Sequence, residues 1–195
     1  MFEFEDNVMN TIIEKANIES IVKAQQHLTM LREEHWLSVE LFSFQWWLQL
    51  ALLIIPWVIW WWLVDKERTG KIFAFGLLVL IFTSLMDNVG IELTLWGYPY
   101  LLVPYIVKFL AVNFSILPVS YMLIYQYFPK WKPFITANII FSFGASFIAE
   151  PIFVWLNLYQ MYKWKYVYSF FIYILLSLFL KYLVEKVFIN KENSE

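Results

Sequence analysis

The sequence predicts an all-α protein, a polytopic transmembrane helix bundle of about five spans preceded by an amphipathic helical segment. Hydrophobic residues make up 61% of the 195 residues and charged residues only 15%. The apolar residues fall into five runs of about 20, the helix length that crosses the hydrocarbon core of a bilayer. The chain also carries 11 Trp and 12 Tyr. Such rings favour the membrane–water interface, so we expect an integral membrane protein.

Short polar or aromatic segments separate the apolar runs. Residues 65–71 read DKERTGK and residues 129–133 read PKWKP. Residues 91–103 contain LWGYPY, which is typical of an interfacial turn. We therefore expect spans at residues 43–64, 72–90, 104–128, 134–156 and 166–184. The predicted parts of the chain are the amphipathic segment (1–42), the transmembrane bundle (43–185) and a polar tail (186–195).

The first 42 residues are the one long polar stretch before the C-terminal tail. Their apolar side chains recur at helical spacing, which predicts one or two amphipathic helices. The polar face is acidic, which disfavours both insertion into hydrocarbon and attraction to anionic lipid. We expect this segment to be helical and to stay outside the hydrocarbon core. The apolar positions are Met9, Ile12, Ile13, Ala16, Ile18, Ile21, Val22 and Leu28; the acids are Glu14, Glu19, Glu33 and Glu34.

Three prolines lie inside predicted spans. Proline has no N–H, and its ring displaces the carbonyl four residues earlier. Pro118 should therefore free the carbonyl of Phe114, and Pro151 that of Phe147. Pro56 should disturb the first span in the same way. We expect a kink at each of these positions.

The basic residues predict the orientation, because Lys and Arg concentrate in cytoplasmic loops. Eight of the 14 fall on one side of the five-span topology. Five fall on the other side and Lys108 lies inside a span; the five are Lys15, Lys23, Arg32, Lys163 and Lys165. We expect a multi-pass plasma-membrane protein whose N-terminus is outside and whose C-terminus is cytoplasmic. The cytoplasmic group comprises Lys66, Arg68, Lys71, Lys130, Lys132, Lys181, Lys186 and Lys191.

The composition excludes several classes of function. A formal charge of −2 offers nothing for a nucleic-acid partner, and the lack of cysteine excludes thiol and iron–sulfur chemistry. His27, Glu34 and His35 lack the i, i+3 or i+4 spacing of helical metal sites. No phosphate-binding glycine loop or nucleophile elbow is present. We therefore predict no metal and no cofactor.

Three ionisable residues lie inside predicted spans, where charge is costly and often functional. They are Asp87, Lys108 and Glu150, and the topology puts all three near the outer ends of their spans. Asn113 lies slightly deeper. We predict a ligand-binding layer of Asp87, Lys108, Asn113 and Glu150, in which Lys108 approaches a carboxyl. Asp87 and Glu150 are the candidates for any catalytic role.

The same residues also fit a structural role. Lys108 and a carboxyl form an ordinary ion pair if they meet between helices, and polar side chains bind helices together across a membrane. Lys108 is also close enough to the interface to extend its ammonium group into water.

Several motifs occur together in this sequence: Asp87, LWGYPY at 95–100, LPVSYMLIYQY at 117–127, Glu150-Pro151, Trp164 and YSF at 168–170. Together they resemble a family of small, uncharacterised integral membrane proteins of spore-forming Firmicutes. The likeness covers roughly residues 40–185. The family pattern often has an acid where this chain has Asn113, so a site that needs this carboxyl would be incomplete here. The resemblance implies a bacterial plasma-membrane protein and no particular activity.

Three functions fit these features. The first is a binding protein that holds a small amphiphilic or lipid-like ligand in a polar pocket near the outer leaflet. The second is a membrane-embedded acid–base enzyme that protonates an isoprenoid-like substrate. The third is a structural or partner-binding membrane subunit, with the polar layer as packing. Membrane lipids are the expected partners in every case.

The predicted orientation can be tested with single cysteines, because the natural chain has none. A cysteine at Arg68 should resist an impermeant thiol reagent in intact cells, whereas one at Gly97 or Gln160 should react. Equal labelling at all three positions would contradict the topology.

Overall fold

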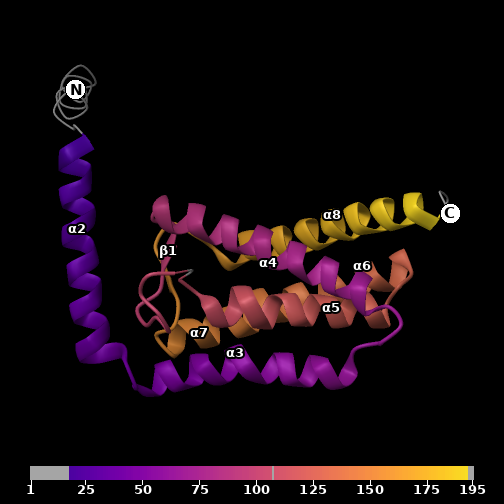
Figure 1. Ribbon diagram of the computed structural model, residues 1–195, viewed down its shortest axis with the longest axis horizontal. Coiled ribbons are helices and arrows are strands. Elements are labelled where there is room, and N and C mark those ends of the chain that lie inside the picture. Colours follow the sequence, from indigo (N-terminus) through magenta and orange to yellow (C-terminus); the bar gives the residue numbers. More distant parts are fainter. Residues whose placement is uncertain (1–17, 107, 193–195) are drawn as a thin grey trace. The chain divides into compact units, whose positions relative to one another are not determined.

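The computed structural model describes residues 18–106 and 108–192, with side chains as far as residue 187, and it is all-α apart from two short strands. The chain divides into two compact units, Met1–Leu41 and Phe42–Glu195. Figure 1 shows the elements of each unit in chain order. We describe the two units separately.

The described part of the first unit is helical, as predicted. Helix α2 (Ile18–His35) continues into a π-helical turn, η1 (Trp36–Glu40). Lys23 and Glu19 form an ion pair across one turn of α2, with 2.6 Å between Nζ and Oε1. No residue of α2 is buried, so its apolar side chains are exposed. The predicted apolar positions from Met9 to Ala16 lie outside the described residues.

The described part of the second unit contains four helices that are long and apolar enough to cross a membrane. They are α3 (Phe44–Leu63), α4 (Thr69–Glu92), the continuous helix Trp131–Trp155, and Tyr166–Val187 within α8 (Tyr166–Glu192). The helix Trp131–Trp155 comprises α6 (Trp131–Gly144), the π-helical turn η3 (Ala145–Ala149) and α7 (Glu150–Trp155). These helices confirm four of the five predicted spans as helices of membrane-crossing length and composition.

The remaining predicted span, residues 104–128, is shorter than expected. Its regular part begins with the helical residues 110 and 111, continues through a π-helical turn, η2 (Val112–Ile116), and ends with α5 (Leu117–Tyr127). These 18 residues rise about 27 Å at 1.5 Å each, slightly less than the roughly 30 Å of a hydrocarbon core. Most of α5 is buried among the other helices. Its hydrophobicity thus serves the interior of the bundle, and a full crossing by this segment stays a prediction.

Among the described residues, the π-helical turns η2 and η3 each end two positions before a helical proline, Pro118 or Pro151. In each turn the residue directly before the proline donates the last i+5 bond: the N–H of Leu117 to the carbonyl of Val112, and that of Glu150 to the carbonyl of Ala145. The carbonyl of Phe114 accepts a hydrogen bond from Nε1 of Trp57 at 2.9 Å. The predicted free acceptor therefore exists, and helix α3 satisfies it.

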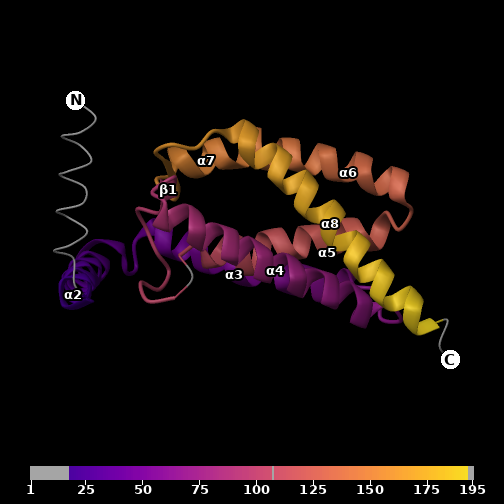
Figure 2. The same cartoon turned by 90° about the horizontal axis from the view of Figure 1, so that it is seen from above.

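The helices pack around α5 and α8. Helix α5 contacts α3, α4 and α6, and η2 also lies against α3 and α4. Helix α8 contacts both α4 and α6. Figure 2 shows α8 beginning beside α7 and crossing towards α4. Helix α8 therefore connects the helix formed by α6, η3 and α7 with α4.

A pair of two-residue strands closes one end of the bundle. Strand β1 (Trp96–Gly97) pairs antiparallel with β2 (Gln160–Met161), and we call this pair the clasp. It joins the loop after α4 to the loop before α8. Helix α3 holds the first loop as well, because Gln49 donates to the carbonyl of Tyr100 at 3.1 Å. The predicted interfacial turn at residues 91–103 is thus an ordered, hydrogen-bonded structure.

Lys181 anchors α8 at the opposite end. Its side chain is fully buried, and Nζ donates to the carbonyl of Pro129 at 2.7 Å and pairs with Glu185 at 3.1 Å. Its Nζ also lies 4.4 Å from the ring centroid of Phe134 and 4.9 Å from that of Tyr125. Its position among the predicted cytoplasmic basic residues gives no indication of this burial.

The α4–α5 contact depends on Gly76. A Cβ at this position would lie 2.4 Å from Sδ of Met122, whose side chain is fully buried. We predict that Gly76→Ala lowers the free energy of unfolding by about 1–3 kcal/mol, the usual cost of overpacking, despite the better helix propensity of alanine. Thermal unfolding in detergent measures the effect.

The matched control is Gly70→Ala, because nothing lies within 4 Å of a Cβ at Gly70. Met122→Ala removes the side chain that a Cβ at position 76 would meet. The double variant Gly76→Ala/Met122→Ala should therefore lose less free energy of unfolding than the sum of the losses in the two single variants. Strict additivity of the two substitutions would contradict the packing argument.

Candidate functional site

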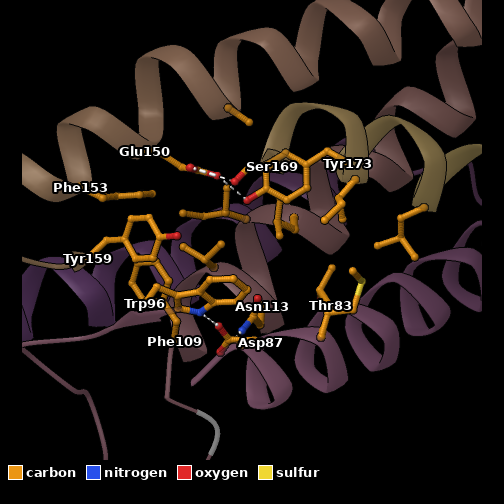
Figure 3. A pocket seen from close by; sticks show the side chains of 18 of the residues that line it. Thr83, Asp87, Trp96, Phe109, Asn113, Glu150, Phe153, Tyr159, Ser169 and Tyr173 are labelled. Carbon is orange, nitrogen blue, oxygen red and sulfur yellow. Dashed lines mark hydrogen bonds between the residues drawn. The ribbon is translucent and has the colours of Figure 1, made fainter. Parts of the chain in front are cut away.

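A cavity of about 760 Å³ lies between α4, η2, α7 and α8, at the end closed by the clasp. Its size falls within the range of about 300–1,000 Å³ typical of small-molecule sites. Most of its surface is apolar, and its polar groups come mainly from Asp87, Glu150 and the side chains that bind them. Figure 3 shows Asp87 with Asn113 and Trp96 on one side, and Glu150 with Ser169 and Tyr173 on the other.

Asp87, in the last two turns of α4, is almost completely buried and accepts three hydrogen bonds. Its Oδ1 accepts from Nε1 of Trp96 at 2.9 Å and from the hydroxyl of Tyr98. Its Oδ2 accepts from Nδ2 of Asn113 at 2.9 Å. Two donors come from the loop after α4, which we call the clasp loop, and one comes from η2, so the carboxyl joins three segments of the chain.

The local sequence positions these donors. Gly90 lies one turn after Asp87, and a Cβ there would lie 2.0 Å from the ring of Trp96. Only glycine therefore leaves room for the indole to reach the carboxyl. Burial, followed by the negative charge of Asp87, raises the pKa of Tyr98 well above its ordinary value. The phenol consequently stays protonated and can donate at physiological pH.

Glu150 is the first residue of α7 and is also buried. Its Oε2 accepts from the hydroxyl of Ser169 at 3.1 Å, and its Oε1 accepts from that of Tyr173 at 2.9 Å. Nε1 of Trp164 donates in turn to Oγ of Ser169 at 2.9 Å. Ser169 and Tyr173 lie one turn apart on α8, so a single helical face serves this carboxyl.

Tyr159 lines the cavity near both carboxyls. It comes from the loop that carries β2, and its side chain is nearly buried. Burial raises its pKa most, and the charges of Glu150 and Asp87 raise it further. The phenol is thus a neutral hydroxyl that faces the cavity, as Figure 3 shows.

The cavity opens towards the outer face of α4. Leu85 and Val89 both line it, yet each has 59% of its surface exposed. Side chains that are exposed and line a cavity mark its rim. Because α4 is one of the helices long enough to cross a membrane, this rim lies on an apolar surface.

The structure brings together three of the four predicted ligand-binding residues. Asp87, Asn113 and Glu150 all line the cavity, whereas Lys108 is not among the lining residues. Nζ of Lys108 donates to the carbonyl of Pro104 at 2.8 Å. Among the residues that the structure describes, neither carboxyl forms an ion pair, so the expected approach of Lys108 to a carboxyl is not seen.

An amide suits position 113 because it can donate a hydrogen bond to Asp87. Nδ2 of Asn113 donates to Asp87, and an ionised acid in its place would bring a second negative charge beside the first. The site is therefore built around two carboxyls.

The sequence interpretation missed the aromatic and hydroxyl donors. The sequence places Trp96 and Tyr98 in an interfacial turn and Ser169 and Tyr173 within a span, and it gives none of them as a partner of a carboxyl. The i, i+4 spacing of the last two, one turn apart on an apolar helix, was the available signal. Nothing in the sequence pairs them with Glu150, because the contact spans 19 residues and two helices.

Comparison of the chain with protein-family models, curated proteins and solved structures found no match.

We predict that Tyr98→Phe lowers the free energy of unfolding by about 1–3 kcal/mol, because a buried carboxyl loses a donor. Tyr162→Phe is the matched control, since Tyr162 is 54% exposed and its hydroxyl lies 3.5 Å from Gln160. Thermal unfolding of both variants in detergent gives the comparison. Equal stability of the two variants would show that the Tyr98 hydroxyl does not support Asp87.

Proposed function

We propose that the cavity binds a small amphiphilic or lipid-like molecule. The observation that carries this proposal is the combination of an apolar cavity of about 760 Å³ with two buried carboxyls from different helices. Apolar pockets with a few converging polar groups are the usual form of small-molecule sites.

The two kinds of lining suit the two parts of an amphiphile. The carboxyls lie towards the clasp with Tyr159, where a polar head would find hydrogen-bonding partners. Away from them the walls are hydrocarbon, including Phe82, Ile116 and Leu176. An apolar chain laid along these walls would be removed from competing polar groups.

The rim at Leu85 and Val89 gives such a molecule a route from the bilayer. A lipid-like molecule that entered here would not have to pass through water. With the basic loops 65–71 and 129–133 in the cytoplasm, the clasp end faces the outer leaflet of the plasma membrane. This orientation supports a ligand drawn from that leaflet.

The alternative of an acid–base enzyme uses the same two carboxyls. A general acid needs an O–H directed at its substrate. Each of the four carboxyl oxygens instead accepts a hydrogen bond from a protein donor. This arrangement favours binding and positioning over proton donation, so the binding function is the better supported of the two.

The proposal predicts that Asp87→Asn and Glu150→Gln reduce the amount of lipid-like molecule that co-purifies with the protein. Each amide has nearly the volume of the acid but loses the charge and one acceptor oxygen. Mass spectrometry of organic extracts, at equal amounts of folded protein, measures the loss.

The control is Glu92→Gln, which removes an exposed carboxyl from the same helix, α4, outside the cavity. It should retain as much ligand as the natural protein. If the two cavity variants unfold in detergent while the bound molecule is unchanged in what remains folded, the carboxyls are structural and the proposal is wrong.

A further inference from the structure

The cavity is lined by acidic side chains that no basic side chain of the described lining balances. Among the described residues that line it there are two acids, Asp87 and Glu150, and no Lys, Arg or His. Neither acid forms an ion pair within the described part of the chain. Lys108, the basic partner that the sequence predicts, donates from its Nζ to the carbonyl of Pro104. The neighbouring hydrogen bonds orient the carboxyls but bring no positive charge.

The carboxyls also keep unused hydrogen-bonding capacity. A carboxylate accepts about four hydrogen bonds in total. Asp87 receives three from protein side chains and Glu150 receives two. Further donors can therefore bind at both groups, and the natural donors for such positions are N–H groups of a cation.

The aromatic lining adds a second attraction for positive charge. Trp96 and Trp164 lie 4.8 Å apart between ring centroids, and Tyr98 lies 5.7 Å from Tyr159. All four rings line the cavity. Rings of this kind attract cations through their electron-rich faces, most strongly away from water.

From these features we infer that the ligand carries a positively charged amine as its polar head: a long-chain alkylammonium or a related cationic amphiphile. This inference rests on the proposed function and narrows it. The amine lies between the carboxyls and the rings, and its alkyl chain follows the apolar walls towards the rim. An anionic lipid head would meet two carboxyls and no cation in the same space.

The experiment compares four probes with one chain length: hexadecylamine, hexadecyltrimethylammonium, hexadecanol and hexadecanoic acid. The full chain is purified in a neutral detergent, and native mass spectrometry counts the retained probe. The alkylammonium is charged at pH 7, because its pKa is close to the roughly 10.4 of lysine. We expect the two cations to be retained about tenfold more than the alcohol, and the acid least.

The preference should depend on the cavity carboxyls. In Asp87→Asn and Glu150→Gln the retention of hexadecylamine should fall towards that of hexadecanol. Glu92→Gln measures non-specific attraction of cations to the acidic protein and should leave the preference unchanged. The comparison of probes on the natural protein does not depend on any variant folding.

Each other outcome contradicts a defined part of the argument. Equal retention of amine and alcohol, or best retention of the acid, would overturn the amine assignment while leaving an amphiphile site in place. A cation preference that survives both cavity variants would also overturn it, because the charge would then lie elsewhere. Retention of none of the four probes would contradict the proposed function itself.

Discussion

The burial of Asp87 is the constraint on which this end of the bundle depends. A carboxyl removed from water is costly unless its oxygens are hydrogen-bonded, so the surrounding chain must supply donors. Here they come from Trp96 and Tyr98 in the clasp loop and from Asn113 in η2. The loop after α4 is therefore ordered from within by one side chain. Buried Glu150 needs donors in the same way, and Ser169 and Tyr173 of α8 supply them.

The prolines explain how an apolar helix leaves room for these polar contacts. Both η2 and η3 widen the helix directly before a proline, and these two turns lie beside the cavity. Asn113 lies within η2, and Glu150 directly follows η3. An i+5 pattern rotates the residues that follow it relative to a regular α-helix. Two irregularities thus place two of the site's polar residues. The clasp then holds the loops that supply their aromatic neighbours.

Much of this architecture could be predicted from composition and periodicity. Four apolar helices of membrane-crossing length follow from the length of each run, and the helix α2 follows from its spacing. Asp87 and Glu150 were also identified, because charge within an apolar run is exceptional. Three features could not be obtained in this way. The shortness of α5, the burial of Lys181 and the donors to Glu150 depend on contacts between segments far apart in sequence. Lys181 illustrates the difficulty, since a lysine near the end of an apolar run looks identical whether it reaches water or meets Glu185 and aromatic rings.

The position of the rim has a consequence for how occupancy of the cavity is controlled. Leu85 and Val89 line the cavity on the exposed side of α4, a helix long and apolar enough to cross a membrane, and in a bilayer that side would adjoin acyl chains. If the proposed amphiphile exchanges through that rim, occupancy of the cavity depends on the mole fraction of the amphiphile within the two-dimensional bilayer, and its aqueous concentration matters only through partitioning. Dilution with inert lipid or detergent would then empty the cavity even when the surrounding buffer is unchanged. A cell could regulate such a site simply by altering the composition of one leaflet.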